Sequence, residues 1–232
     1  MILRHELKYQ ISTLEHQVLQ KKLCIMLKPD PNMAPRKAYN VKTLYFDDFQ
    51  DSAFYQKQAG IYKRKKYRLR IYNNSDSVIK FERKSKISSY ILKETTLIKR
   101  KEADKIVAGE FGFLANTDNR LLREFYLDSR CELMHPVVIV EYEREAYVHP
   151  IGKVRITFDS CLRVGMDTRL FFDKDAYMTN AINQKNIVLE VKYNEVFPEY
   201  IRGLFPDTIR PRLAIGKFVI CRSQQMNRRG FF

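Results

Sequence analysis

Charged and apolar residues alternate in six segments of this chain, and this alternation constrains the fold more than any other feature. Side chains along a β-strand point to the two faces of the sheet in turn. In IKFERKSK (79–86), Lys80, Glu82 and Lys84 therefore share one face, while Ile79 and Phe81 point to the other. The same pattern occurs in RHELKY (4–9), KYRLRIY (66–72), VEYERE (140–145), KVRITFD (153–159) and VLEVKY (188–193).

One strand of this kind is typical of any sheet with a solvated face. Six such strands, whose polar faces carry mainly Arg, Lys and Glu, indicate a more specific surface. If the sheet closes into a barrel, one arrangement places the charges inside and the apolar faces against flanking helices. A barrel of about eight strands leaves room for side chains or one small ligand.

The remaining pattern places further strands and helices along the chain. Ser12 and Glu15 predict a capping box that begins a helix with Leu14, Val18, Leu19 and Leu23 on one face. Asn73-Asn74-Ser75-Asp76 predicts a hairpin turn. Strands are expected at 3–11, 41–46, 62–72, 78–86, 90–98, 137–148, 153–158 and 188–193. Helices are expected at 12–27, 52–58, 102–108 and 119–127, from about 198, and after 212.

About eight strands with helical insertions predict one α+β domain around a barrel or a curved sheet. Closed into a barrel, such a sheet would form a tunnel with a basic interior. Unpaired charge inside such a tunnel is costly, so anions are expected there. Triphosphate suits the site, because Arg pairs with phosphate in a bidentate manner and Lys as a point charge. The glutamates would then bind a divalent cation, Mn²⁺ or Mg²⁺.

Composition agrees with a polyanionic partner. The chain has 42 Lys and Arg against 27 Asp and Glu, a net charge of +15, which repels itself in the compact state. Nucleic acid, an anionic membrane or a phosphate-rich small molecule would relieve it. The N-terminal residues lack the apolar core of a signal peptide, and no apolar stretch approaches the ~20 residues that span a bilayer. We therefore expect a cytoplasmic protein, with its four cysteines as mostly buried thiols.

The motifs together resemble the VTC domain, the catalytic domain of the vacuolar transporter chaperone polyphosphate polymerases, in the triphosphate tunnel metalloenzyme superfamily. Each motif alone is weak, but eight lie in the family's order and span nearly the whole chain. They are RHELKY (4–9), LYFDD (44–48), YRLRIY (67–72), KFERKS (80–85), YERE (142–145), VRITFD (154–159), LEVKY (189–193) and AIGKF (214–218).

The resemblance implies a single α+β domain over residues 1–232, built as a closed antiparallel β-barrel tunnel of about eight strands with a basic interior. It also implies an enzyme that transfers the γ-phosphoryl group of ATP to a growing polyphosphate chain and releases ADP. It implies that Glu190 holds the metal, assisted by Glu6, and that Lys57, Lys80 and Lys192 contact the substrate. The residues it implies to line the catalytic tunnel and bind phosphate are Lys8, Arg68, Arg70, Lys84, Arg144, Arg155 and Lys217.

The chain departs from the family pattern in three respects. Lys57 stands where the family often has an arginine, which keeps the charge but loses bidentate geometry. The usual Ser-Lys pair near the C-terminus is Gly216-Lys217 here. No regulatory SPX domain or membrane helix is recognisable, so we expect a stand-alone catalytic unit or one held at the inner face of a membrane by a partner protein.

Three other functions remain open from the sequence. Water as the acceptor would make the same tunnel a triphosphatase. A non-catalytic polyphosphate-binding module would keep the basic lining but lose the metal glutamate, and Glu190 disfavours it. Nucleic-acid binding is suggested by the charge and by YKRKKYRLRIY (62–72). That segment lacks a recognisable RNP, KH or helix-turn-helix pattern, so we expect no nucleic-acid partner.

Overall fold

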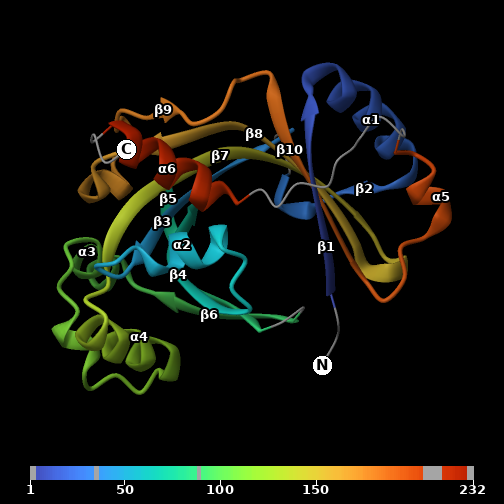
Figure 1. Ribbon diagram of the computed structural model, residues 1–232. Helices are drawn as coiled ribbons and strands as arrows, with labels where there is room; N and C mark the ends of the chain where they lie inside the picture. The colour runs from blue at the N-terminus through green and yellow to red at the C-terminus, as the bar shows by residue number, and fades with distance from the viewer. Residues whose placement is uncertain (1–3, 34–36, 88–89, 206–215, 229–232) are drawn as a thin grey trace. The chain divides into compact units, whose positions relative to one another are not determined.

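The computed structural model describes residues 4–33, 37–87, 90–205 and 216–228 (Figure 1). Over these residues the chain forms ten β-strands and six α-helices, and the α+β class is confirmed. The chain divides into two compact units that alternate along the sequence. The first unit comprises Met1–Asn40, Tyr142–Leu162 and Ile182–Gly216, and the second comprises Val41–Glu141, Arg163–Ala181 and Lys217–Phe232.

The first unit is built on strands in the order β1-β10-β8-β7, with the short β2 paired to β7. The strands are β1 (Arg4–Ser12), β2 (Lys28–Pro29), β7 (His135–His149), β8 (Val154–Gly165) and β10 (Asn186–Asn194), and the helices are α1 (Thr13–Met26) and α5 (Glu199–Arg202). Apolar side chains on one face of β8 and β10, such as Ile156 and Leu189, pack with Leu19 and Leu23 of α1 and Ile201 of α5.

Helix α1 begins with the predicted capping box. The Ser12 side chain accepts a hydrogen bond from the backbone N–H of Glu15, and the Glu15 carboxylate accepts one from the backbone N–H of Ser12. The predicted apolar face is wrong in part. Leu19 and Leu23 are buried, but Leu14 and Val18 are exposed. The sheet therefore covers a narrower face of this helix than the four apolar residues predict.

The second unit has the strand order β7-β3-β4-β5-β6, and β9 pairs with the end of β8. Strand β7 occurs in both orders because its residues are divided between the units. The other strands are β3 (Tyr39–Asp47), β4 (Lys63–Tyr72), β5 (Ser75–Ile87), β6 (Tyr90–Ile98) and β9 (Thr179–Asn180), and the helices are α2 (Ser52–Gln58), α3 (Arg100–Val107), α4 (Arg120–Cys131) and α6 (Lys217–Arg228).

The hairpin between β4 and β5 is tighter than the sequence suggests. Tyr72 pairs with Ser75, so only Asn73 and Asn74 form the turn, and both have positive φ angles, 53° and 51°. A two-residue turn with positive φ at both positions matches the right-handed twist of the strands. Asparagine tolerates this conformation better than most residues, and β5 consequently begins at Ser75 rather than at Val78.

The two faces of the β4–β5 hairpin differ sharply in chemistry. Tyr67, Leu69 and Phe81 are fully buried and pack against Phe125 of α4 and Ile106 of α3. Helices α3 and α4, green in Figure 1, therefore belong to the core side of this unit. Because side chains alternate along a strand, the arginines and lysines between these apolar residues lie on the opposite face.

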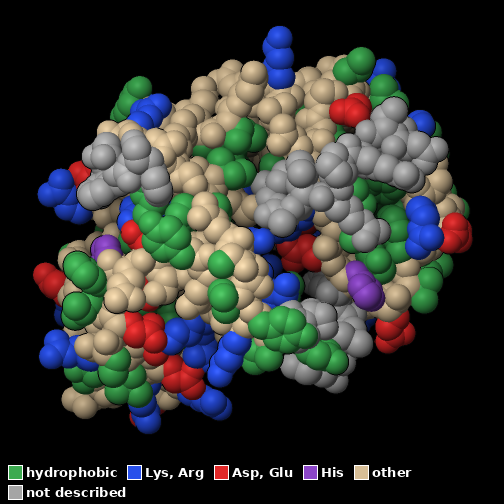
Figure 2. Space-filling model, viewed as in Figure 1, with side chains coloured by type: hydrophobic (Ala, Val, Ile, Leu, Met, Phe, Trp, Pro, Cys, Tyr) green, Lys and Arg blue, Asp and Glu red, His purple; other side chains and the backbone are tan. Residues whose placement is uncertain are grey.

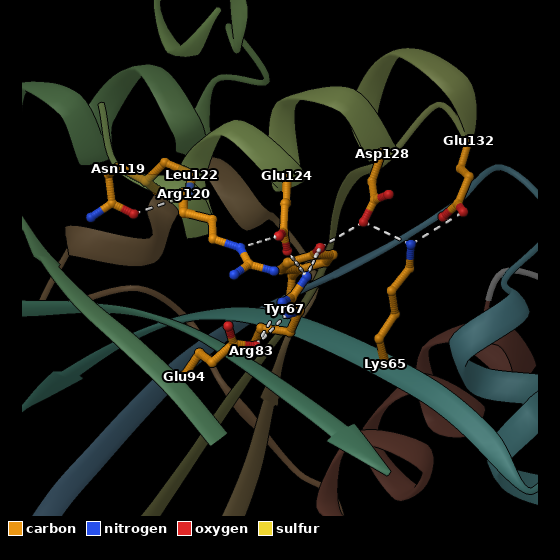
Figure 3. Close-up of polar contacts among 10 residues, drawn as sticks. All are labelled: Lys65, Tyr67, Arg83, Glu94, Asn119, Arg120, Leu122, Glu124, Asp128 and Glu132. Carbon is orange, nitrogen blue, oxygen red and sulfur yellow. Dashed lines mark hydrogen bonds and ion pairs between the residues drawn. The ribbon is translucent and has the colours of Figure 1, made fainter. Parts of the chain in front are cut away.

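A polar network holds α4 to the core side of the sheet (Figure 3). The Tyr67 hydroxyl donates to Asp128 Oδ2 at 2.6 Å, and Lys65 Nζ lies 2.7 Å from the same oxygen. Arg83 bonds Glu94 of β6 at 2.8 Å and pairs with Glu124 of α4. The network joins three strands to one helix, so we infer that its role is to fix α4 on the sheet.

Tyr67→Phe is expected to lower the free energy of unfolding by about 1–2 kcal/mol, because Asp128 loses a donor in a half-buried site. The measurement is urea unfolding at neutral pH. Arg120→Ala is the control, since Arg120 is exposed and pairs with Glu124 on the surface of α4. It is expected to change stability by less than about 0.5 kcal/mol. Equal effects of the two substitutions would contradict the role given to Tyr67.

Closure of the sheet into a barrel is not confirmed. Among the described strands, β1 is hydrogen-bonded on one side to β10 and β6 on one side to β5, so the hydrogen-bonded order has two ends. Strand β8 also continues to Gly165, well beyond the predicted end at 158, past a positive φ at Cys161. No helix within the described ranges is long and apolar enough to cross a membrane.

The prediction of mostly buried thiols is wrong. Cys221 is buried and Cys161 is half-buried, but Cys24 and Cys131 are exposed, and all four are free. Cys131 ends α4, and Cys24 lies on α1, where its Sγ is 3.4 Å from the hydroxyl of the buried Tyr147. For the predicted basic C-terminal helix, the described part begins at Lys217, and residues 206–215 lie outside the described ranges.

Candidate phosphate-binding site

The polar face of strands β4, β5 and β6 is strongly basic, and we call it the basic face. Cross-strand pairing places Arg70 beside Lys80, Arg68 beside Glu82, and Lys66 beside Lys84, which in turn pairs with Lys93. In the described residues of these strands the face carries eight cations and a single carboxylate, Glu82. The cations are Arg64, Lys66, Arg68, Arg70, Lys80, Lys84, Lys86 and Lys93.

Glu82 is the centre of the basic face, and its side chain is fully buried. Arg68 Nε donates to Glu82 Oε2 at 2.6 Å, Arg70 Nη1 lies 3.7 Å from the same oxygen, and Lys93 pairs with Oε1. Burial alone would raise the pKa of Glu82, but Arg68, Arg70 and Lys93 outweigh it and lower the pKa to about 2. The carboxylate therefore stays ionised and orders the two arginines side by side.

This arrangement predicts a loss of stability in acid. The folded pKa of Glu82 lies below its ordinary value of about 4.5, so ionised Glu82 stabilises the fold above that pH, and the contribution disappears as the pH falls towards 2. The total is on the order of 3 kcal/mol. Urea unfolding between pH 5 and pH 2 is expected to show a smaller decline for Glu82→Gln than for the wild type. Parallel declines would contradict this account of Glu82.

Two residues of β3 complete the arginine site, and sequence reasoning missed both. Arg70 Nε donates to Thr43 Oγ1 at 3.2 Å, and Tyr45 pairs in register with Arg68. Burial would raise the pKa of Tyr45, but Arg68 and Arg70 lower it below its usual value. Both residues lie in or beside the LYFDD motif, so alternation along 41–46 was a signal that could have found them.

The other predicted residues of this unit lie on three kinds of element: the basic face, helix α2 and helix α6. Lys80 and Lys84 lie on the basic face, and Lys80 Nζ is 5.0 Å from the Tyr72 ring centroid. Lys57 is in the last turn of α2, and Lys217 is the first residue of α6. Lys93 was missed, because the segment 90–98 was predicted as a strand without counting its polar face.

In the first unit, the predicted residues gather around Glu190 of β10, which is 5% exposed. Lys8 Nζ lies 3.5 Å and Lys192 Nζ 3.2 Å from Glu190 Oε1, and Arg144 Nη2 lies 3.6 Å from Oε2. Lys8 also pairs with Glu6 at 2.7 Å. The antiparallel register produces this cluster, because Lys8 stands opposite Glu190 and Glu6 opposite Lys192.

Arg144 is held by a second carboxylate. Its Nε and Nη2 donate to the two oxygens of Asp159 at 2.6 and 2.8 Å, a bidentate pair on the adjoining strand. Burial alone would lower the pKa of Arg144, but Asp159 and Glu190 outweigh it and raise the pKa well above the usual value. Arg144 is therefore permanently charged and fixed in orientation. Asp159 was recognised as a polar-face residue but not as the partner of this arginine.

Arg155 of β8 pairs with Lys192 of β10, two residues along β10 from Glu190. Its Nε donates to Asp30 Oδ2 at 3.0 Å, and its Nη2 donates to the Tyr39 hydroxyl at 3.0 Å. Burial would raise the pKa of Asp30, but hydrogen bonds from Asn32 and the charge of Arg155 together lower it. Asp30 lies between Pro29 and Pro31, outside the alternating segments, so the strand pattern carried no signal of its role.

The described residues contain no group of three or more Asp, Glu, His or Cys side chains that could hold a metal ion. Mg²⁺ and Mn²⁺, however, are commonly bound through one or two carboxylates together with substrate phosphates. Glu190 and Glu6 offer oxygen ligands of this kind on neighbouring strands, bridged by Lys8. The donor set therefore fits a divalent cation that binds together with phosphate.

On the visible surface, Lys and Arg side chains are interspersed with Asp and Glu (Figure 2). The Glu190 cluster is mixed in the same way, with Lys8, Lys192 and Arg144 against Glu190, Glu6 and Asp159. The basic face differs, because its eight cations share the face with a single buried carboxylate. Such a group suits a ligand that carries several adjacent negative charges.

Similar solved structures include a candidate adenylate cyclase from Bacillus halodurans, with 11% identity and a TM-score of 0.50 over 88% of this chain and 86% of that chain. They also include the PH1819 protein from Pyrococcus horikoshii OT3, with 12% identity and a TM-score of 0.47 over 95% of this chain and 99% of that chain. No curated protein sequence matches the chain.

The first of these structures supports the fold alone at such low identity. Family membership comes from the sequence, whose eight motifs lie in the order of one family. The profile of that family, described as the VTC domain, matches residues 3–224. Because the match covers nearly the whole chain, the protein belongs to the VTC-domain family, as its motifs predict.

Proposed function

We propose that this protein is a polyphosphate polymerase that transfers the γ-phosphoryl group of ATP to the end of a polyphosphate chain and releases ADP. Membership of the VTC-domain family supports a function in polyphosphate or triphosphate chemistry. The observation that carries the proposal is the basic face, where eight cations share one face of three strands with a single buried carboxylate. Half-buried cations in such excess are costly without an anionic ligand, and a phosphate chain supplies several negative charges in a row.

The residues of the chain supply positioning and charge. Phosphoryl transfer needs little covalent help from a protein, and most of the rate comes from orientation and stabilisation of charge on the transferred group. Arg68 and Arg70, ordered by Glu82, present guanidinium donors for phosphate oxygens. Lys84 adds a point charge from the neighbouring strand. The nucleophile is the terminal phosphate of the chain, or inorganic phosphate at initiation.

The Glu190 cluster has a complementary chemistry. Lys8, Lys192 and Arg144 provide cations for phosphate oxygens, and the fixed geometry of Arg144 follows from its pairing with Asp159. Glu190 and Glu6 would hold Mn²⁺ or Mg²⁺ together with substrate phosphates. When bound, such a cation neutralises charge on those phosphates.

Triphosphate hydrolysis is the second candidate, because it requires the same phosphate-binding residues and differs only in the acceptor. The experiment is incubation of the purified protein with ATP and Mn²⁺, followed by a gel stained for polyphosphate and assays of ADP and free phosphate. The proposal predicts a ladder of polyphosphate together with ADP. Free phosphate without a ladder would instead favour a triphosphatase, and neither product would favour a binding module or an absent partner.

A further inference from the structure

Lys66 lies on the basic face in an unusual setting. It is half-buried on β4, directly opposite Lys84 of β5, which is itself opposite Lys93 of β6. Its Nζ lies 4.2 Å from the ring centroid of Phe218 on α6. Three lysines thus form one row across three strands, and the Phe218 ring lies beside the first of them.

Charged groups on α2, β3, β4 and β5 act on Lys66. Lys57 of α2, Arg64 of its own strand and Lys84 of β5 oppose a positive charge there, and Asp47 of β3 favours one. The carboxylate oxygens of Asp47, however, accept hydrogen bonds from the backbone N–H groups of Ala53 at 2.8 Å and Phe54 at 3.0 Å. The counter-charge is therefore already engaged by the first turn of α2.

The consequence is a lysine that titrates near neutral pH. Burial, followed by the charges of Lys57, Arg64 and Lys84, lowers the pKa of Lys66 to about 7, against the opposing effect of Asp47. Burial also raises the pKa of Asp47, to about 6. Above pH 7 the carboxylate is ionised and Lys66 is largely a neutral amine. A phosphate chain on the basic face would reverse the balance at Lys66, because its negative charge favours the ammonium form.

We propose that Lys66 takes up a proton when a phosphate chain binds the basic face, so that substrate binding is coupled to proton uptake at this side chain. The inference rests on the proposed function. It adds Lys66 to the residues that bind phosphate and makes the binding dependent on pH. The proton comes from solvent: the neutral amine of Lys66 becomes an ammonium group beside the phosphate, and no other bond forms or breaks. The affinity for phosphate chains then falls as the pH rises above 7.

The test is calorimetric titration with tripolyphosphate at pH 8, in two buffers with different heats of ionisation, which gives the number of protons taken up. At this pH Asp47 is ionised in both states and contributes little. Lys66→Arg keeps the charge without titrating near neutral pH. Lys63→Met is the matched control, because Lys63 is exposed on the same strand and points to the opposite face. Lys66→Met, which also lacks the titrating amine, replaces Lys66→Arg if the arginine variant does not fold.

The wild type and Lys63→Met are expected to take up about one proton more per tripolyphosphate than Lys66→Arg. Above pH 7, the dissociation constant for tripolyphosphate is expected to rise with pH more steeply for the wild type and Lys63→Met than for Lys66→Arg. The additional rise is roughly tenfold per pH unit. Protons of the ligand itself cancel in this comparison. Equal proton uptake by the wild type and Lys66→Arg would overturn the inference and leave the proposed function intact. A wild-type protein that does not bind tripolyphosphate would overturn both.

Discussion

Replacing Arg70 with alanine is expected to lower kcat/KM for ATP roughly 100- to 1,000-fold, the usual effect of removing one preorganised donor from a charged transition state. Arg70 is buried on the basic face, bonded to Thr43 and close to Glu82. Its loss leaves Glu82 with Arg68 and Lys93, so the carboxylate keeps two cations and the fold is expected to survive. The measurement is steady-state ADP release, with circular dichroism as the check on folding.

Two further variants sharpen this test. Lys84→Ala removes a point charge from the same face and is also expected to abolish most turnover. Arg130→Ala removes an exposed arginine from α4, on the core side of the unit, and is expected to retain wild-type activity. Full activity in both Arg70→Ala and Lys84→Ala would contradict the assignment of the basic face to phosphate binding.

Glu190→Gln is expected to raise the Mn²⁺ concentration for half-maximal activity roughly 10- to 100-fold, the range seen when metal-site groups are altered. The amide keeps the shape of Glu190 but removes the charge that a hard divalent cation requires. The measurement is activity against Mn²⁺ concentration at saturating ATP. Folding is expected to change much less, because Lys8 retains Glu6 and Arg144 retains Asp159 as partners.

A matched control is Glu143→Gln on β7. Glu143 is exposed and points to the face opposite Arg144, so its loss changes the net charge by the same amount without touching Glu190. We expect it to leave the Mn²⁺ dependence unchanged. If Glu190→Gln also leaves Mn²⁺ activation unchanged, Glu190 does not bind the metal.

Much of the fold follows from local sequence. Alternation in KYRLRIY and IKFERKSK predicted two strands, and Asn73-Asn74-Ser75-Asp76 predicted the turn that joins them, although only Asn73 and Asn74 form it. The capping box at Ser12 and Glu15 predicted the start of α1. These features depend on residues near one another in the chain, and for such features the sequence pattern carries the physical cause.

Features that depend on pairing between distant residues could not be predicted in the same way. Glu82 was assigned to the polar face, but its contact with Arg68, Arg70 and Lys93 requires the register of three strands. The predicted end of strand β8, at residue 158, is too early. The alternating pattern breaks after Asp159, but pairing with β9 continues the strand beyond Cys161.

For the candidate site, alternation identified the residue types, and pairing decides their neighbours. Lys66 is the first residue of the alternating segment KYRLRIY, but its row with Lys84 and Lys93 emerges only from the cross-strand register. Asp30 lies in a loop and reaches Arg155 across 125 residues of sequence. The roles of all these residues in binding and catalysis stay predictions until the variants are measured.

We propose that the acceptor of the phosphoryl group is a phosphate chain and not water. The most direct measurement is incubation of the protein with γ-labelled ATP, tripolyphosphate and Mn²⁺, followed by separation of the labelled products by size. Transfer to a phosphate chain predicts label in chains longer than the tripolyphosphate primer, with ADP released in equal amount. Label recovered only as free phosphate, with no chain longer than the primer, would contradict it.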